Sequence, residues 1–483
     1  MNLRNAAANA ASDVNGLAKL SAHELLDGYR TGAFTPRDVI EDVIAALEQA
    51  DETCNVVVTP MYAQARAEAD VATAAWASGR PALSLQGVPV TVKDLVYVAD
   101  VPAFGGAPCN KGLVPSVDSA VVAALRAAGA IVTCKTTTCE SGYKLTADSP
   151  VSGITRNPWN TERTSGGSSG GAAAAVAAGC GPLAIGTDGV GSIRVPASFC
   201  GVVGIKPTFG LVPRSPGFSP PSWGSLAHTG PIGRTVADVA LLLGVIAHHD
   251  LRDPVSLVVS ARTFDVTPGS LGGLRIGASV DFGYAAVDPD VRRAFTAAVE
   301  VLEQLGAWIS PDCAKLSPDM LEQVLKPIAY TEQAAAMAAR GADALVQSDE
   351  DYRTVLRKGA DYSGIDYIEA TYRRNALRAS FVELFQKFDA IITPTVAVTA
   401  FKAGTLGVDR IDGIPVDDHL GWSPFSWPIN LTGLPAATIP CGFDSAGLPI
   451  GLQIIAPWLD EAVILRIAAA FEAAHPWAQF RPG

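Results

Sequence analysis

The sequence has few charged residues and no run of basic ones. Lys, Arg, Asp and Glu make up 17% of the 483 residues, and the formal net charge at pH 7 is −12. Proteins that bind nucleic acids or anionic membranes do so through clusters of Lys and Arg. The charge pattern therefore argues against nucleic acid and against a membrane surface as partners.

Cysteine and histidine lack the spacing of a metal site. The eight Cys residues include no CxxC pair, and the six His residues do not lie at metal-ligand spacing. Zinc sites and the disulfide frameworks of secreted domains both use regular spacings. We therefore expect no metal and no disulfide scaffold, and we expect the thiols to be kept in a reducing compartment, the cytoplasm.

Long apolar runs are missing as well. No uncharged apolar stretch approaches membrane-spanning length, and the first 20 residues are small and polar, without the apolar core of a signal peptide. We expect a soluble, cytoplasmic protein that begins with a flexible tail over residues 1–20.

The sequence does contain a regular alternation of helix and strand patterns. A capping box of Ser21 and Glu24 begins one helix, and Thr35 with Pro36 begins another. Further helices are predicted at 117–128, 172–178, 236–246, 289–305 and 461–471, and strands at 56–59, 88–92, 130–134, 274–278, 390–393 and 450–455. This alternation indicates an α/β fold. Because no clear linker interrupts it, we expect residues 21–483 to form a single domain.

The stretch from Thr164 to Ala197 contains Gly/Ser-rich turns on either side of an alanine-rich helix and a short strand. Glycine lets backbone N–H groups approach a ligand and point together at one negative charge. By itself, GGSSGG also fits a flexible linker or a phosphate loop. However, a Walker loop needs a Lys beside its Ser or Thr, and a dinucleotide fingerprint needs an acidic residue about 20 positions on. Neither pattern fits cleanly.

The residues that follow these turns resemble the amidase signature family. The strongest match is GTDGVGSIRVPAS at Gly186–Ser198. Weaker matches are GVPVTVKD at Gly87–Asp94, RNPWN at Arg156–Asn160, GIKPT at Gly204–Thr208, DAIITPT at Asp389–Thr395 and NLTGLPA at Asn430–Ala436. The resemblance extends over nearly the whole chain, with a catalytic core at about residues 85–210.

The resemblance implies a catalytic triad of Lys93, Ser168 and Ser192. Lys93 corresponds to the general base, Ser168 to the bridging serine and Ser192 to the nucleophile that becomes acylated, with a cis peptide before Ser168. The backbone amides of Gly189, Val190, Gly191 and Ser192 correspond to the oxyanion hole. The family often has glycine where Val190 stands, so the detailed geometry of this hole is expected to differ.

The proposed chemistry is physically reasonable for these residue types. A serine hydroxyl is a poor nucleophile until a base takes its proton, and no His of this chain stands in a serine-hydrolase context. Burial lowers the pKa of a lysine and so supplies a neutral amine. Ser168 can then relay the proton between Lys93 and Ser192. We interpret Ser169, Asp188 and Arg194 as supporting residues, the last two as an ion pair or loop brace.

The resemblance implies a single α/β/α sandwich with a large mixed β-sheet flanked by helices, and an amidase that hydrolyses the C–N bond of a small linear amide without a cofactor. Homodimers are common in the family. Five aromatic residues are candidates for the pocket wall and favour an aryl or apolar substrate, although aromatic residues more often belong to the core: Tyr143, Tyr330, Trp422, Phe425 and Trp427.

Two other functions remain open. The glutaminase component of a tRNA-dependent amidotransferase carries the same triad and passes the ammonia that it releases to a partner protein. The second is a catalytically silent binding protein with this fold, which would be expected to lack a triad residue. The stretch Ser423–Asn430 looks more like that of stand-alone amidases.

Overall fold

The computed structural model describes residues 16–482 except 81–82, 219–224, 261, 312 and 417. Most of the expected flexible tail, residues 1–15, lies outside the described residues. The expectation does not hold for residues 16–20, because Leu17–Lys19 form a short 3-10 helix. The amide of Ala18 donates to Asp42 Oδ2 at 2.7 Å, and the Ala18 side chain is buried.

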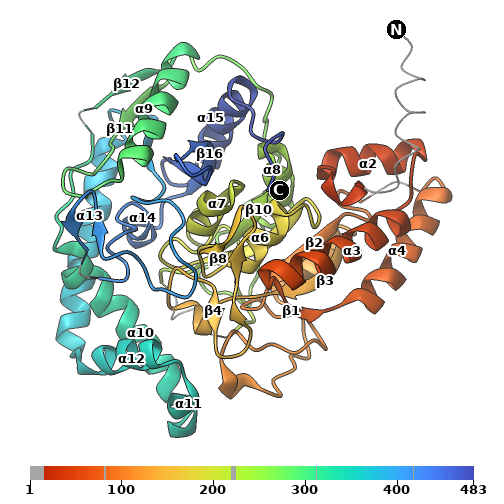
Figure 1. Ribbon diagram of the computed structural model, residues 1–483, viewed down its shortest axis with the longest axis horizontal. Helices are drawn as coiled ribbons and strands as arrows, with labels where there is room; N and C mark the ends of the chain where they lie inside the picture. The colour runs from red at the N-terminus through yellow and green to blue at the C-terminus, as the bar shows by residue number, and fades with distance from the viewer. Residues whose placement is uncertain are drawn as a thin grey trace.

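An eleven-stranded mixed sheet runs through the part of the chain that the structure describes (Figure 1). The strand order is β1 (Val57–Pro60), β3 (Ile131–Thr136), β2 (Pro89–Lys93), β8 (Leu183–Asp188), β10 (His228–Gly233), β9 (Val203–Lys206), β16 (Ala436–Phe443), β17 (Pro449–Ile455), β13 (Ala390–Pro394), β11 (Arg275–Ala278) and β12 (Trp308–Ser310). Three small antiparallel pairs lie outside it in the described residues: β4 (Asp148–Ser149) with β5 (Gly153–Ile154), β6 (Arg156–Asn157) with β7 (Asn160–Thr164), and β14 (Arg410–Ile411) with β15 (Ile414–Pro415).

Helices flank this sheet, which confirms the predicted α/β fold. They are α2 (Ala22–Thr31), α3 (Pro36–Cys54), α4 (Tyr62–Ala77), α5 (Ala120–Ala127), α6 (Gly170–Ala177), α7 (Arg194–Cys200), α8 (Val236–Ile246), α9 (Pro289–Gln304), α10 (Lys326–Ala338), α11 (Ala342–Gln347), α12 (Glu350–Asp361), α13 (Gly364–Leu384), α14 (Trp427–Thr432) and α15 (Glu461–Ala474). Figure 1 shows α2, α3 and α4 on one side of the molecule and α10, α11 and α12 on the opposite side. Within the described residues, no helix has the length and apolar character needed to cross a membrane.

The helix-capping residues predicted from the sequence begin helices in the structure. The Ser21 hydroxyl accepts from the amide of Glu24, while the Glu24 carboxylate accepts from the amide of Ser21, so the capping box begins α2. Thr35 and Asp38 form a second capping box at the start of α3, where Pro36 occupies the first helical turn. These bonds satisfy backbone N–H groups that have no partner inside a helix.

The topology places the catalytic candidates at one edge of the sheet. Strands β2 and β8 are parallel neighbours, with Val92 opposite Ile185. The carboxyl ends of parallel strands meet at the same edge of a sheet. Lys93 ends β2 and Asp188 ends β8, so their side chains arise close together. The loops that carry Ser168 and Ser192 lead into the buried helices α6 and α7.

Candidate active site

Lys93 lies at the centre of a buried hydrogen-bond cluster. Its side chain is 0% exposed. Nζ lies 2.7 Å from Ser168 Oγ, 2.9 Å from Ser169 Oγ and 2.8 Å from Thr187 Oγ1. Burial lowers the pKa of Lys93 to about 7, although the nearby Cys139 and Asp188 act in the opposite direction. A neutral amine is therefore available near neutral pH, which an exposed lysine does not offer.

Ser168 and Ser169 are held in a fixed backbone geometry. The Gly167–Ser168 peptide is cis, as the resemblance implied. A Cβ atom on Gly167 would overlap the backbone of Thr146, so only glycine fits there. Ser169 Oγ donates to Thr187 O at 3.0 Å, which fixes Ser169 against the end of β8. Ser168 and Ser169 thus present their hydroxyl groups to Lys93 from one turn.

Ser192 is buried, and its hydroxyl finds no hydrogen-bond partner among the described residues. The expected relay is therefore only half formed among the described residues, because Ser168 contacts Lys93 but no hydrogen bond joins it to Ser192. The backbone still links the two turns, because the amide of Ser169 donates to the carbonyl of Ser192 at 3.1 Å. A buried hydroxyl without a partner costs about 1–3 kcal/mol and usually has a functional reason.

The loop between β8 and α7 differs in one detail from the expected oxyanion hole. The amide of Gly191 donates to Asp188 Oδ1 at 2.8 Å, so it is held toward the protein rather than toward a substrate. The Val190 carbonyl accepts from Ser426 Oγ at 2.7 Å. Gly189 and Val190 line a cavity beside Ser168. The amides of Gly189, Val190 and Ser192 therefore remain the candidates for contact with an oxyanion.

Asp188 and Arg194 form a fully buried, two-pronged ion pair. Arg194 Nε lies 3.0 Å from Asp188 Oδ2, and Nη2 lies 3.0 Å from Oδ1. Burial opposes ionisation of Asp188, but Arg194, Lys206 and Asn430 together outweigh it and keep the pKa of that carboxyl below its usual range. Arg194 also donates to Gln453 Oε1 and Asn430 Oδ1, each at 2.6 Å. The pair thereby links the loop before Ser192 to the second half of the chain.

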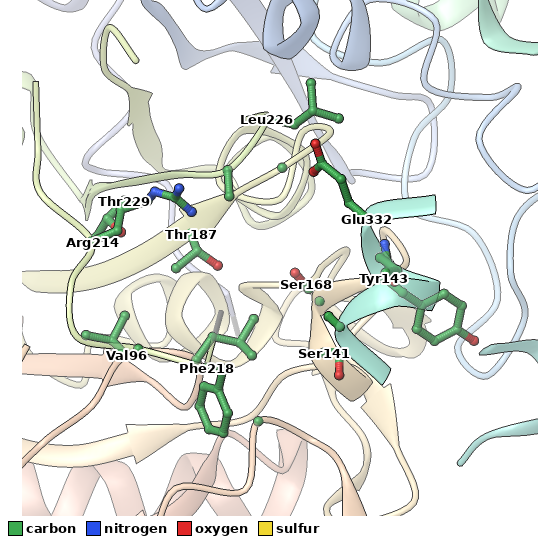
Figure 2. A pocket seen from close by; sticks show the side chains of 18 of the residues that line it. Val96, Ser141, Tyr143, Ser168, Thr187, Arg214, Phe218, Leu226, Thr229 and Glu332 are labelled. Carbon is green, nitrogen blue, oxygen red and sulfur yellow. The ribbon is translucent and has the colours of Figure 1, made fainter. Parts of the chain in front are cut away.

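A cavity of about 220 Å³ opens beside these residues, lined by Ser168, Thr187, Gly189 and Val190 on the catalytic side (Figure 2). Apolar side chains line much of the rest, among them Leu95, Val96, Phe218, Leu226 and Met337. Arg214, Glu332 and Arg340 add charge to its wall. A hydroxyl nucleophile, a buried base and a mostly apolar cavity suit attack on the carbonyl of a small organic molecule.

A family model described as "Amidase" matches residues 38–465, which is most of the chain. The chain belongs to the amidase family. An acylamidase from Rhodococcus erythropolis is 33% identical over 469 residues, 96% of this chain and 97% of that protein. One component of the glutamyl-tRNA(Gln) amidotransferase from Thermosynechococcus vestitus is 36% identical over 471 residues, 92% of this chain and 96% of that protein.

The solved structure of a bacterial aryl acylamidase, described as belonging to the amidase signature enzymes, superimposes on this amidase with a TM-score of 0.87. It is 30% identical, and the match covers 95% of this chain and 97% of that one. Family and relatives together identify this amidase as a hydrolase that acts on carbon–nitrogen bonds in amides.

The predicted aromatic wall of this amidase is only partly present. Tyr143 and Tyr330 line the cavity. Figure 2 shows the Tyr143 ring turned away from Ser168, and this ring stacks on Tyr352 with 4.5 Å between centroids. The prediction is wrong for the remaining candidates, which do not line the cavity and are buried in the core: Trp422, Phe425 and Trp427.

The reason is packing. Trp422 stacks on Phe199 with 5.8 Å between centroids, and Phe425 packs edge-on against Phe282 at 5.5 Å. Large aromatic side chains remove more apolar surface from water than any others, so the core competes for them.

Several residues of the cavity wall were not predicted from the sequence. Phe218 lies in a Pro-rich loop that carries no motif, and Glu332 and Met337 lie on α10, which was not predicted. A signal was present for α10, since Lys326–Ala338 is rich in alanine with Pro327 in its first turn. No spacing in the sequence connects this helix to Ser168, so its place at the cavity could not be inferred.

Proposed function

We propose that this amidase hydrolyses a small carboxamide with an aryl or apolar group through an acyl-Ser192 intermediate. The observation that carries the proposal is the geometry around Lys93. A buried lysine with a pKa of about 7 contacts Ser168. The Ser192 hydroxyl, which has no partner among the described residues, follows Gly189 and Val190, and these two residues line the cavity. This is an activated serine with a base other than histidine.

The proposed reaction has two stages. In the first, neutral Lys93 accepts a proton from Ser168, Ser168 accepts one from Ser192, and Ser192 Oγ attacks the amide carbonyl. The amides of Gly189, Val190 and Ser192 donate to the oxyanion that forms. The C–N bond breaks, and the leaving amine receives the proton through Ser168.

In the second stage, water attacks the acyl-Ser192 ester. Lys93 and Ser168 remove a proton from this water and return one to Ser192 Oγ. The carboxylic acid leaves and the free serine is restored. Because an acyl-serine also forms from esters, we expect esterase activity as a side reaction.

The glutaminase component of an amidotransferase remains the second candidate function, because the amidotransferase relative is as similar as the acylamidase. The wall residues Val96, Phe218 and Leu226 suit an aryl or apolar group. Arg214, Glu332 and Arg340 in the same wall offer charges of both signs to the carboxylate and ammonium of glutamine, so an assay rather than the cavity separates the two functions. Release of ammonia from glutamine, together with a stoichiometric partner protein, would favour the alternative instead.

The test is hydrolysis of benzamide, an anilide, an aliphatic amide, a dipeptide amide and glutamine, with release of ammonia or amine as the readout. Wild type is expected to hydrolyse the aryl or apolar members, while Ser192→Ala and Lys93→Ala lose this activity. Activity retained by either variant contradicts the proposed mechanism.

Three further features of this amidase are still predictions from the sequence alone. They are a single domain over residues 21–483, a cytoplasmic location, and a homodimer without nucleic acid. Size-exclusion chromatography with light scattering measures the assembly directly.

A further inference from the structure

Glu332 on α10 lines the same cavity as Ser168 but takes no part in the proposed reaction (Figure 2). Its Oε1 atom accepts hydrogen bonds from Ser225 Oγ at 2.9 Å and from the Tyr367 hydroxyl at 3.1 Å. The described residues donate no hydrogen bond to its other oxygen, Oε2, and none of them forms an ion pair with it. Within the part of the chain that the structure describes, one oxygen of this carboxyl group is thus fixed, and the other has no hydrogen-bond donor.

Arg374 and Arg214 lie near Glu332, but among the described residues no ion pair is formed with its carboxyl group. Burial raises the pKa of Glu332 to about 7, while Ser225, Tyr367, Arg374 and Arg214 act in the opposite direction. The Arg374 guanidinium donates to the hydroxyl and the carbonyl of Ser225, each at 2.9 Å, rather than to the carboxyl group. A carboxyl oxygen without a partner at an apolar cavity is unfavourable unless a ligand supplies a donor.

A second acceptor lies next to it on the helix. Gln333 also lines the cavity, and its Oε1 atom is buried without a hydrogen-bond partner among the described residues. Two unused acceptor oxygens from consecutive residues make this part of the wall a site for a hydrogen-bond donor.

We propose that Glu332 determines substrate specificity by accepting, through Oε2, a hydrogen bond from an O–H or N–H group that the amide substrate carries away from its scissile bond. This inference rests on the proposed amide hydrolysis at the same cavity. The donor is a neutral group, because Arg214 and Arg374 already lie near the carboxylate and would repel a cation. The substrate class is therefore an amide whose aryl or apolar group bears a hydroxyl or a neutral N–H.

The test uses substrate pairs that differ only in the donor. They are 4-hydroxybenzamide with 4-methylbenzamide, and N-(4-hydroxyphenyl)acetamide with N-(4-methylphenyl)acetamide, so that the donor lies on the acyl or on the amine side. Wild type is expected to favour the hydroxyl compound of at least one pair by about tenfold in kcat/KM, chiefly through KM. Glu332→Leu is expected to abolish this preference, and Glu332→Gln, which keeps an acceptor oxygen, to retain part of it.

Glu369→Gln, on the exposed face of α13, is the matched control and is expected to leave the preference unchanged. If Glu332→Leu does not fold, Glu332→Met, which preserves the length of the side chain, gives the same comparison. No preference in wild type for either pair, or a preference that persists in the apolar variant, overturns the inference.

Binding separates this inference from the proposed function. Calorimetry with Ser192→Ala measures the affinity for the same compounds without turnover. Tighter binding of a hydroxyl compound that is lost in Ser192→Ala/Glu332→Leu supports the role of Glu332 even if wild type hydrolyses none of them. If wild type hydrolyses the methyl compounds and shows no preference for the hydroxyl compounds, amide hydrolysis is supported and the proposed role of Glu332 is wrong.

Discussion

Among single residues, Lys93 has the most unusual environment in the site. Its amine is fully buried and is surrounded by hydroxyl and carbonyl oxygens rather than by a carboxylate within hydrogen-bond distance. Burial therefore destabilises the ammonium form relative to the neutral amine. An ion pair would have held the lysine protonated, so the absence of such a pair among the described residues is what makes this side chain suitable as a base.

We predict that kcat/KM rises with pH through an apparent pKa of about 7. Lys93 must be neutral to accept a proton, so activity is low below this value and reaches a plateau above it. Lys93→Arg is expected to lower kcat/KM by at least about a hundredfold at every pH, because the guanidinium stays protonated. Initial rates on the best substrate of the panel measure both effects.

Lys387→Arg is the control for this change, since Lys387 is exposed and neither it nor its sequence neighbours line the cavity. It should reproduce the wild-type profile. A flat profile across neutral pH, or substantial activity in Lys93→Arg, would show that another group is the base.

At the scale of elements, the loop between β8 and α7 determines the position of Ser192. Gly191 has a φ of +131°, and an added Cβ atom would lie 2.5 Å from Ser426 Oγ. Gly189, two residues earlier, has no atom within 4 Å of such a Cβ. The two glycines are thus alike in sequence context and different in what the fold demands of them.

Gly191→Ala is therefore expected to lower the free energy of unfolding by about 2 kcal/mol, from strained backbone and overpacking against Ser426. Gly189→Ala is expected to change it by less than about 0.5 kcal/mol, as at other unconstrained positions. Chemical denaturation of both variants measures the difference. Equal stabilities would mean that this loop is not held in the described conformation.

The sequence predicted most elements that have a clear boundary signal. The helices α2 and α3 begin at the expected cap residues, and α8 and α9 begin at the predicted positions 236 and 289. Strands β9 and β10 were not predicted, because β9 is only four residues long and β10 contains Gly230, Pro231 and Gly233, which are typical of turns.

The candidate site was predicted only where it lies within a motif. Lys93, Ser168 and Ser192 were assigned from segments that resemble a family, and the structure brings them to one edge of the sheet. The cavity wall was largely missed, because Phe218 and Glu332 come from a loop and a helix that no motif includes. Side chains that meet only through tertiary packing leave no spacing to detect.

At the scale of the whole molecule, the site depends on both halves of the chain. Strand β9 from the first half pairs directly with β16 from the second, with Ala436 opposite Lys206, so the sheet is continuous across the halves. Arg194, which fixes the loop before Ser192, donates to Asn430 and Gln453. Residues 85–210 contain the triad but not the partners that hold it.

This dependence leads to a prediction about a divided chain. A fragment of residues 1–269 ends in an exposed loop and keeps Lys93, Ser168 and Ser192, but it exposes the edge of β9 and leaves the buried Asp188–Arg194 pair without Asn430 and Gln453. Unpaired strand edges associate with strands of other molecules, and buried ions that lose their hydrogen bonds strongly destabilise the folded state. The fragment alone is therefore expected to be inactive and to unfold without a cooperative transition.

Co-expression of residues 1–269 with residues 270–483 supplies the control, because the two pieces together contain every contact across β9 and β16. Their complex is expected to recover amide hydrolysis and a cooperative thermal transition by calorimetry. Amide hydrolysis by the first fragment alone would show that the catalytic residues need only their own half of the sheet, and that the contacts of Arg194 with the second half serve stability without positioning Ser192.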